Sequence, residues 1–181
     1  MSEFVIRPAD LSDAEEMLAI YAPYVRETAV SFEYAAPSAD EFRGRIRTVT
    51  ENFPWLAAEQ DGRIIGYAYA SRFHERAAYR YCCETTVYIR EDKKRLGAGK
   101  ALYQALEAAL RRQGIRNLYA CVAVTDAEDG HLTPDSVRFH EALGFAVTGR
   151  FHRCGYKFSR WYDVVWMEKI IAQVSAADDK I

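Results

Sequence analysis

A short run of basic residues and glycines stands directly before the clearest amphipathic segment of the chain. Residues 90–106 read REDKKRLGAGKALYQAL, and a strand-like segment, CCETTVYIR, comes just before. Small and apolar residues then recur at three- and four-residue steps, which predicts a helix with one buried face. These residues are Ala98, Ala101, Leu102, Ala105, Leu106, Ala109 and Leu110. Arg111 and Arg112 fit the cation-favouring last turn of this helix, and Gly114 fits its end.

A strand, a basic glycine loop and a helix in this order are typical of a site for a phosphorylated ligand. The free N–H groups at a helix N-terminus bind anions, and Gly97 and Gly99 let the backbone come close. Lys93, Lys94 and Arg95 add positive charge. The alternative is a solvated basic turn that only precedes an ordinary helix.

Two common phosphate loops match this stretch poorly. A P-loop needs G-x-x-x-x-G-K-[ST], but Lys94 stands at the first glycine position and Ala101 replaces the hydroxyl residue that binds magnesium. A dinucleotide-binding turn needs G-x-G-x-x-G/A, and Leu102 occupies the third small position. The bulk of Leu102 would hinder close packing of helix on strand, so this second motif fits only in part.

Length and composition predict one globular α/β domain. The chain has 181 residues, half of them hydrophobic and 28% charged, with a net charge of −2 that argues against nucleic-acid binding. No apolar run approaches the ~18 residues of a membrane helix, and the first residues lack a secretory pattern, so we expect no membrane partner and a cytoplasmic location. We expect the domain to span residues 1–171, followed by a frayed polar tail at 172–181.

Periodicity and turn residues predict the remaining elements of a mixed sheet flanked by helices. Ser12 and Glu15 form a capping-box pattern for a helix that we expect to end near Ala22, before Pro23. A further helix is expected at 39–50, and one at 134–143 with Thr133 as its N-cap. Strands are expected at 4–9, 55–60, 63–73, 82–90, 115–124, 146–155 and 161–171, with a hairpin turn at Asp61-Gly62.

The cysteines and histidines do not predict a metal site. Cys82, Cys83, Cys121 and Cys154 form no C-x-x-C pair, and the four histidines do not supply zinc-ligand spacing. We expect reduced thiols.

Several segments, in order, resemble the GNAT superfamily of N-acetyltransferases. The family loop [QR]-x-x-G-x-[GA] is matched by KRLGAG at 94–99, with lysine where glutamine or arginine is usual. The segments SFE, SVRFHEALGF and GYKFSRWYDVVWMEK resemble the subfamily of phosphinothricin and methionine sulfoximine or sulfone acetyltransferases. The resemblance covers most of residues 3–171.

This resemblance implies a fold and a cofactor site. The fold would be a mixed, mostly antiparallel central sheet, splayed where acyl-CoA binds, with helices on both faces. The cofactor would be acetyl-CoA, held by the backbone of the splayed strand, by the basic loop and by the start of the last helix. The implied residues are Val87, Tyr88, Ile89, Lys94, Arg95, Leu96, Gly97, Ala98, Gly99, Lys100, Thr133 and Ser136. Thr133 stands where the family usually has asparagine, and the acidic loop before it, TDAEDGHL, looks longer than the family's.

Two residues stand where the family carries catalytic groups. Glu84 lies in the otherwise neutral stretch YCCETTVYI, which favours a desolvated carboxylate with a raised pKa, and the subfamily places its proposed general base there. The alternative is a carboxylate that faces solvent or pairs with an arginine. His140 stands where many members carry a tyrosine that protonates the leaving thiolate; the alternatives are a cofactor contact or simple packing.

The acceptor implied by the resemblance is a small amine, bound opposite the cofactor. Arg72, Arg76 and Lys157 are candidates to bind a carboxylate, and Glu33 is a candidate to bind an ammonium group. Aromatic candidates for the pocket wall are Phe32, Tyr79 and Trp161, although such residues often only fill the core. A homodimer is also implied. Other amines as acceptors (a protein N-terminus, a polyamine, an aminoglycoside), and a catalytically silent acyl-CoA-binding regulator, remain as alternatives.

Overall fold

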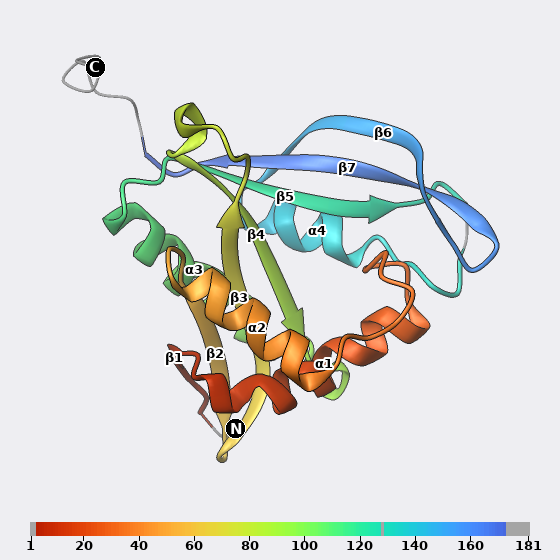
Figure 1. Ribbon diagram of the computed structural model, residues 1–181. Helices are drawn as coiled ribbons and strands as arrows, with labels where there is room; N and C mark the ends of the chain where they lie inside the picture. Colours follow the sequence, from red (N-terminus) through yellow and green to blue (C-terminus); the bar gives the residue numbers. More distant parts are fainter. Residues whose placement is uncertain (1–2, 128, 173–181) are drawn as a thin grey trace.

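One seven-stranded sheet organises the chain, with strand order β1-β2-β3-β4-β5-β7-β6 (Figure 1). The structure, a computed structural model, describes residues 3–127 and 129–172. Among the described residues, β4 and β5 form the one parallel pair and the other pairs are antiparallel, as the family resemblance implies. The strands are β1 (Val5–Pro8), β2 (Trp55–Gln60), β3 (Arg63–Arg72), β4 (Cys82–Ile89), β5 (Asn117–Val124), β6 (Ala146–Lys157) and β7 (Arg160–Ile170). Beyond Ala172, the tail expected at 172–181 lies outside the described residues.

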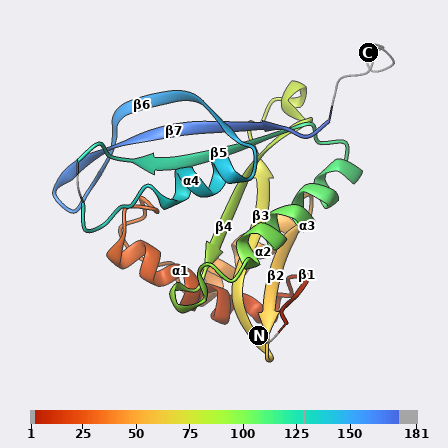
Figure 2. The same cartoon turned by 180° about the vertical axis from the view of Figure 1, so that it is seen from behind.

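Helices cover both faces of the sheet. Helices α1 (Ala14–Glu27) and α2 (Ala39–Thr50) lie on one face, and α3 (Ala98–Arg112) and α4 (Asp135–Ala142) lie on the other (Figures 1 and 2). Three 3-10 turns complete the elements: η1 (Leu11–Asp13), η2 (Ala77–Tyr79) and η3 (Glu91–Lys93). Within the described part of the chain, no helix is long and apolar enough to cross a membrane.

Side chains alternate across each strand, so the two larger buried clusters lie on opposite faces of the sheet. A third, smaller cluster contains Ala29, Ala123, Leu132 and Tyr162. In β3, Tyr67 packs with the α1–α2 cluster, whereas the next residue, Ala68, packs with the α3 cluster. Leu102 and Leu106 belong to the predicted apolar face of α3, and both are fully buried. The apolar spacing that predicted α3 therefore corresponds to the face of the helix that packs against the core.

Helix α1 is longer than its sequence predicts. It continues through Pro23 to Glu27. The capping box expected at Ser12 and Glu15 is instead formed two residues earlier, by Asp10 and Asp13, and it caps the 3-10 turn η1 that leads into α1. Proline in a helix interior removes one hydrogen bond at a cost of about 3 kcal/mol. The buried side chains of Tyr21 and Val25, on either side of the proline, offset that cost.

The expected N-cap of α4, Thr133, is wrong: the N-cap is Pro134, which makes no side-chain capping bond. Two other elements match their predictions closely. Helix α2 has the predicted bounds, and Ser38 and Glu41 form a capping box at its start. The turn between β2 and β3 has positive φ at Asp61 (52°) and Gly62 (73°), as a tight hairpin requires.

Strands β4 and β5 separate after a short parallel contact. They pair only over Cys82–Glu84 and Asn117–Tyr119, whereas β4 continues beside β3 to Ile89 and β5 continues beside β7 to Val124. Figure 1 shows the two strands diverging from their shared end, with α4 behind the opening. The facing edges of both strands are thus without ladder partners, and this splay, expected from the sequence resemblance, creates the candidate site.

Candidate active site

A cavity of about 830 Å³ occupies the opening between β4 and β5. Its lining comes from β4, the basic loop, the first turn of α3, β5, α4 and residues 30–32. Of the expected cofactor residues, all but Leu96 line the cavity; the Leu96 side chain is exposed. Glu84 and His140 line it as well. Segments far apart in the sequence therefore meet around one space.

The basic loop gives one end of the cavity the properties of an anion site. Helix α3 begins here, and the first N–H groups of a helix have no partner within the helix. Gly97 has φ +87° with open space around its α-carbon, so its conformation requires glycine. Lys93, Lys94 and Arg95 add their charges to the same rim. A pyrophosphate would fit this end, because bare backbone and cations are presented together.

Gly99, the second glycine of the loop, is required by packing and not by backbone conformation. A β-carbon on Gly99 would stand 3.1 Å from the ring of Phe139 in α4. Glycine at this position therefore allows α3 and α4 to pack closely where both line the cavity.

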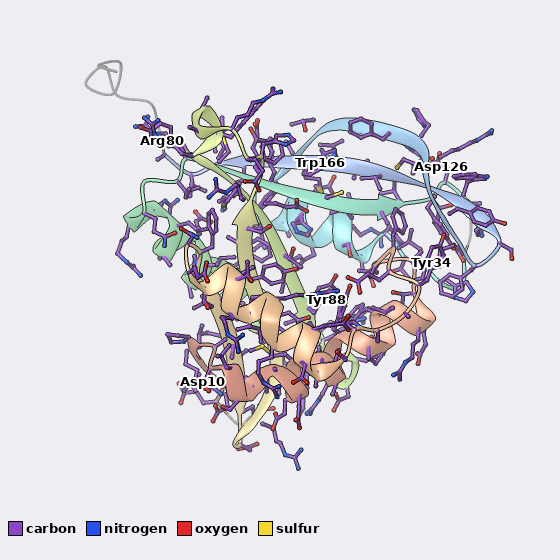
Figure 3. All side chains as sticks on the ribbon, in the orientation of Figure 1. Asp10, Tyr34, Arg80, Tyr88, Asp126 and Trp166 are labelled. Carbon is purple, nitrogen blue, oxygen red and sulfur yellow. The ribbon has the colours of Figure 1, made fainter. Side chains whose placement is uncertain are left out.

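Alternation along β4 places Glu84 and Thr85 on opposite faces of the sheet. Cys83 packs with the α3 cluster and Tyr88 packs with the α1–α2 cluster, so even-numbered residues from Glu84 to Tyr88 face α1. In Figure 3, Tyr88 lies toward α1 and α2 at the lower end of β4. Burial raises the pKa of Glu84. Glu84 lines the cavity, and within residues 3–127 and 129–172 its carboxylate has no hydrogen-bond or ion-pair partner.

Thr85 joins a buried polar network on the α3–α4 side. Its hydroxyl donates to the Tyr119 carbonyl at 3.1 Å, and the Tyr103 hydroxyl lies 3.2 Å from its Oγ1. The same Tyr103 hydroxyl lies 2.8 Å from Nε2 of His140, whose Nδ1 is 2.7 Å from the carbonyl oxygen of Ser136. Burial lowers the pKa of His140, although the bond to Ser136 opposes the shift. This network spans β4, β5, α3 and α4, and so ties both sides of the opening together.

The expected acceptor residues are only partly brought together. Phe32 lines the cavity, but Arg72, Arg76 and Tyr79 lie in and after the end of β3 and do not line it. Glu33 forms an ion pair with Arg45 at 2.6 Å, so its carboxylate already has a cationic partner.

Two further expectations differ from the structure. Lys157 as a ligand for a substrate carboxylate is wrong, because its ammonium group is buried and donates to three backbone carbonyls. Trp161 lies instead on a separate cavity of about 350 Å³, beside Arg150 and Asp163.

Several other lining residues were not predicted from the sequence, among them Tyr69, Ser31 and Cys121. Tyr69 lies opposite Thr86 on the neighbouring strand, and Ser31 hydrogen-bonds to the buried Tyr21 hydroxyl at 2.7 Å. Cys121 faces the cavity from β5, and burial raises the pKa of its thiol to about 12. Strand alternation identifies the face of Tyr69 and Cys121, but nothing local to the sequence indicates that the two strands separate there.

Comparisons with known proteins agree with this geometry. A family profile described as Acetyltransferase (GNAT) domain matches residues 6–166. A phosphinothricin N-acetyltransferase from Alcaligenes faecalis is 37% identical, over 91% of this chain and 80% of its own. An L-methionine sulfoximine/L-methionine sulfone acetyltransferase from Pseudomonas paraeruginosa is 32% identical, over 90% of this chain and 92% of its own.

Solved structures show the same fold. A phosphinothricin acetyltransferase from Sinorhizobium meliloti, in complex with AcCoA, superposes with a TM-score of 0.84 at 32% identity, over 94% of this chain and 89% of that one. An N-acetyltransferase from Staphylococcus aureus Mu50 gives a TM-score of 0.86 at 26% identity, over 94% of this chain and 100% of that one. The chain therefore belongs to the GNAT family of acetyltransferases, and acetyl-CoA is its cosubstrate.

Proposed function

We propose that this enzyme transfers the acetyl group of acetyl-CoA to the amino group of a small amino acid or analogue of the phosphinothricin or methionine sulfoximine and sulfone type. One observation carries the proposal: Glu84 has a raised pKa and an unpaired carboxylate in a cavity that also contains the basic loop. The names of the relatives support the acceptor class.

Glu84 would act as the general base. The acceptor ammonium loses a proton toward the Glu84 carboxylate, and the free amine nitrogen attacks the thioester carbonyl. A C–N bond forms and the C–S bond breaks, so coenzyme A leaves as a thiolate. The nitrogen loses its second proton as the amide forms, and this proton converts the thiolate to the thiol. Glu84 suits this task because burial raises its pKa above the usual value of a glutamate, which makes the carboxylate a stronger proton acceptor.

The β4 backbone would stabilise the charge that develops on the carbonyl oxygen. Val87 and Tyr88 lie beyond the short β4–β5 pairing and line the cavity, so backbone on this edge is available to donate hydrogen bonds. Side-chain replacements at these two positions should have mild effects on acetyl-CoA binding, because the backbone makes the contact.

For His140, the geometry favours a positioning role over that of general acid. The carbonyl of Ser136 can only accept, so Nδ1 of the ring carries a proton. In the neutral ring, Nε2 then accepts the single hydroxyl proton of Tyr103 at 2.8 Å, in preference to Oγ1 of Thr85 at 3.2 Å. Burial also disfavours the charged ring.

We also propose that the enzyme is a cytoplasmic homodimer that associates through the β6–β7 hairpin. Large apolar side chains are exposed along these two strands: Val147, Phe151, Tyr156 and Trp161. Aromatic residues of this kind are enriched at interfaces. A measured monomer mass at micromolar concentration would contradict this assembly.

An amine panel tests the proposed acceptor. Free thiol released from acetyl-CoA would be measured with phosphinothricin, methionine sulfoximine, methionine sulfone, ordinary amino acids, a polyamine and an N-terminal peptide. We expect turnover on the first three. Turnover confined to the polyamine or the peptide would overturn the acceptor class, and acetyl-CoA binding without turnover on any amine would instead support the silent regulator.

A further inference from the structure

Lys157 has a complete set of hydrogen bonds inside the protein. The side chain is only 3% exposed, and Nζ donates to the carbonyls of Val25 at 2.7 Å, Thr28 at 2.8 Å and Ser31 at 2.6 Å. An ammonium group has three N–H donors, so none remains for a ligand. The lysine, at the end of β6, therefore serves the protein's own backbone.

These carbonyls belong to the end of α1 and to the loop that follows it. The last carbonyls of a helix lack partners within the helix and carry the negative end of its dipole, so a buried cation is well placed there. The loop, residues 28–34, contributes Val30, Ser31 and Phe32 to the cavity. Lys157 thus holds a wall of the cavity without lining it.

Two neighbours of Lys157 hold the same loop. The Tyr34 hydroxyl donates to the Tyr156 carbonyl at 2.7 Å, and Figure 3 places Tyr34 beside the hairpin. Gly155 lies directly under the ring of Phe32, since a β-carbon there would stand 2.2 Å from that ring. Residues 155–157 therefore contact the loop at its start, its middle and its end.

We propose that Lys157 is a positioning residue for the amine acceptor. By fixing residues 28–34 it sets the place of Ser31 and Phe32, which line the same cavity as Glu84. The basic loop that we propose for the cosubstrate meets α1 through Tyr24, whose ring lies 5.3 Å from Nζ of Lys94, and not through residues 28–34. We therefore expect Lys157 to act mainly on the acceptor. This inference rests on the proposed function.

Lys157→Met tests this role, because it keeps an unbranched chain and removes the three donors. We expect KM for the amine to rise by about tenfold or more, with Kd for acetyl-CoA changed by less than about twofold. Amide hydrogen exchange in residues 25–34 should accelerate. Lys169→Met is the matched control: it removes an ammonium that bonds Glu107 at 2.6 Å, away from the cavity, and should leave the amine KM unchanged.

An unchanged amine KM in folded Lys157→Met, or an equal loss of acetyl-CoA affinity, would overturn the proposal. If Lys157→Met does not fold, Gly155→Ala is the second test, because it keeps the lysine and displaces Phe32. A raised amine KM in Gly155→Ala would support control of the acceptor by the loop. An unchanged amine KM would overturn the proposal. The exchange measurement needs no turnover. Wild-type enzyme that acetylates no amine would contradict the proposed function. Amide hydrogen exchange in residues 25–34 that is no faster in Lys157→Met than in wild type would contradict the anchoring of the loop by Lys157.

Discussion

The hydroxyl oxygen of Tyr103 lies 2.8 Å from Nε2 of His140 in a buried position between α3 and α4. Because Nδ1 is engaged with the Ser136 carbonyl, this contact leaves a neutral ring without a free N–H. A neutral imidazole in this state holds neighbouring groups in place more readily than it gives up a proton.

His140→Gln should therefore lower kcat by less than about tenfold, since general acid catalysis contributes roughly 10² to 10⁴. The pH dependence of kcat should keep its alkaline limb. Tyr103→Phe is the matched variant and should have a similar, small effect. A loss of about 100-fold together with loss of the alkaline limb would instead identify His140 as the general acid.

Gly97→Ala should weaken acetyl-CoA binding. The residue has φ +87°, so a side chain strains the backbone where α3 begins and moves the N–H groups that we propose bind the phosphates. We expect Kd for acetyl-CoA, measured by calorimetry, to rise by about tenfold, or about 1.4 kcal/mol.

Gly114→Ala is the control for that substitution. Gly114 also has a positive φ, +81°, and open surroundings, but it lies at the far end of α3. Both variants should lose about 1 to 2 kcal/mol of unfolding free energy, and only the change at Gly97 should alter acetyl-CoA binding. Equal losses of affinity would show that the effect is general destabilisation.

Glu84→Gln should make the protein more stable at neutral pH. A carboxyl group whose pKa is raised on folding binds its proton more tightly in the folded state, so stability falls as pH rises from the unfolded pKa through the folded one. Glutamine removes that loss. Thermal unfolding should show a Tm about 2 °C higher than wild type at pH 7 and no difference at pH 4. A lower Tm at pH 7 would indicate that the carboxylate is not desolvated.

Local sequence predicted those parts of the fold that depend on local chemistry. The bounds of α2 at residues 39–50 and the hairpin turn at Asp61-Gly62 were predicted and are confirmed. The predicted end of α1 before Pro23 is wrong, because burial of neighbouring side chains offsets the free-energy cost of proline in the helix. The mostly antiparallel pairing and the splay of the sheet were expected only through family resemblance, since no single segment encodes the separation of β4 from β5.

The candidate site also contains residues that the sequence identifies and residues that it does not. The basic loop and Glu84 are recognisable because their residue types and spacing carry the chemistry, and both line the cavity. Lys157 was misassigned because its partners, the carbonyls of Val25, Thr28 and Ser31, lie more than a hundred positions away in the sequence. Charge on a side chain does not reveal whether its partner is a ligand or the protein's own backbone.

The most direct test of the account compares turnover and cosubstrate binding in Glu84→Gln. The substitution removes the proton acceptor but keeps the shape of the side chain, and the loop that receives acetyl-CoA is untouched. We expect kcat with the best amine to fall by about 100-fold or more, with Kd for acetyl-CoA within about twofold of wild type. Turnover close to wild type, or a parallel loss of acetyl-CoA affinity, would contradict the assignment of Glu84 as the general base.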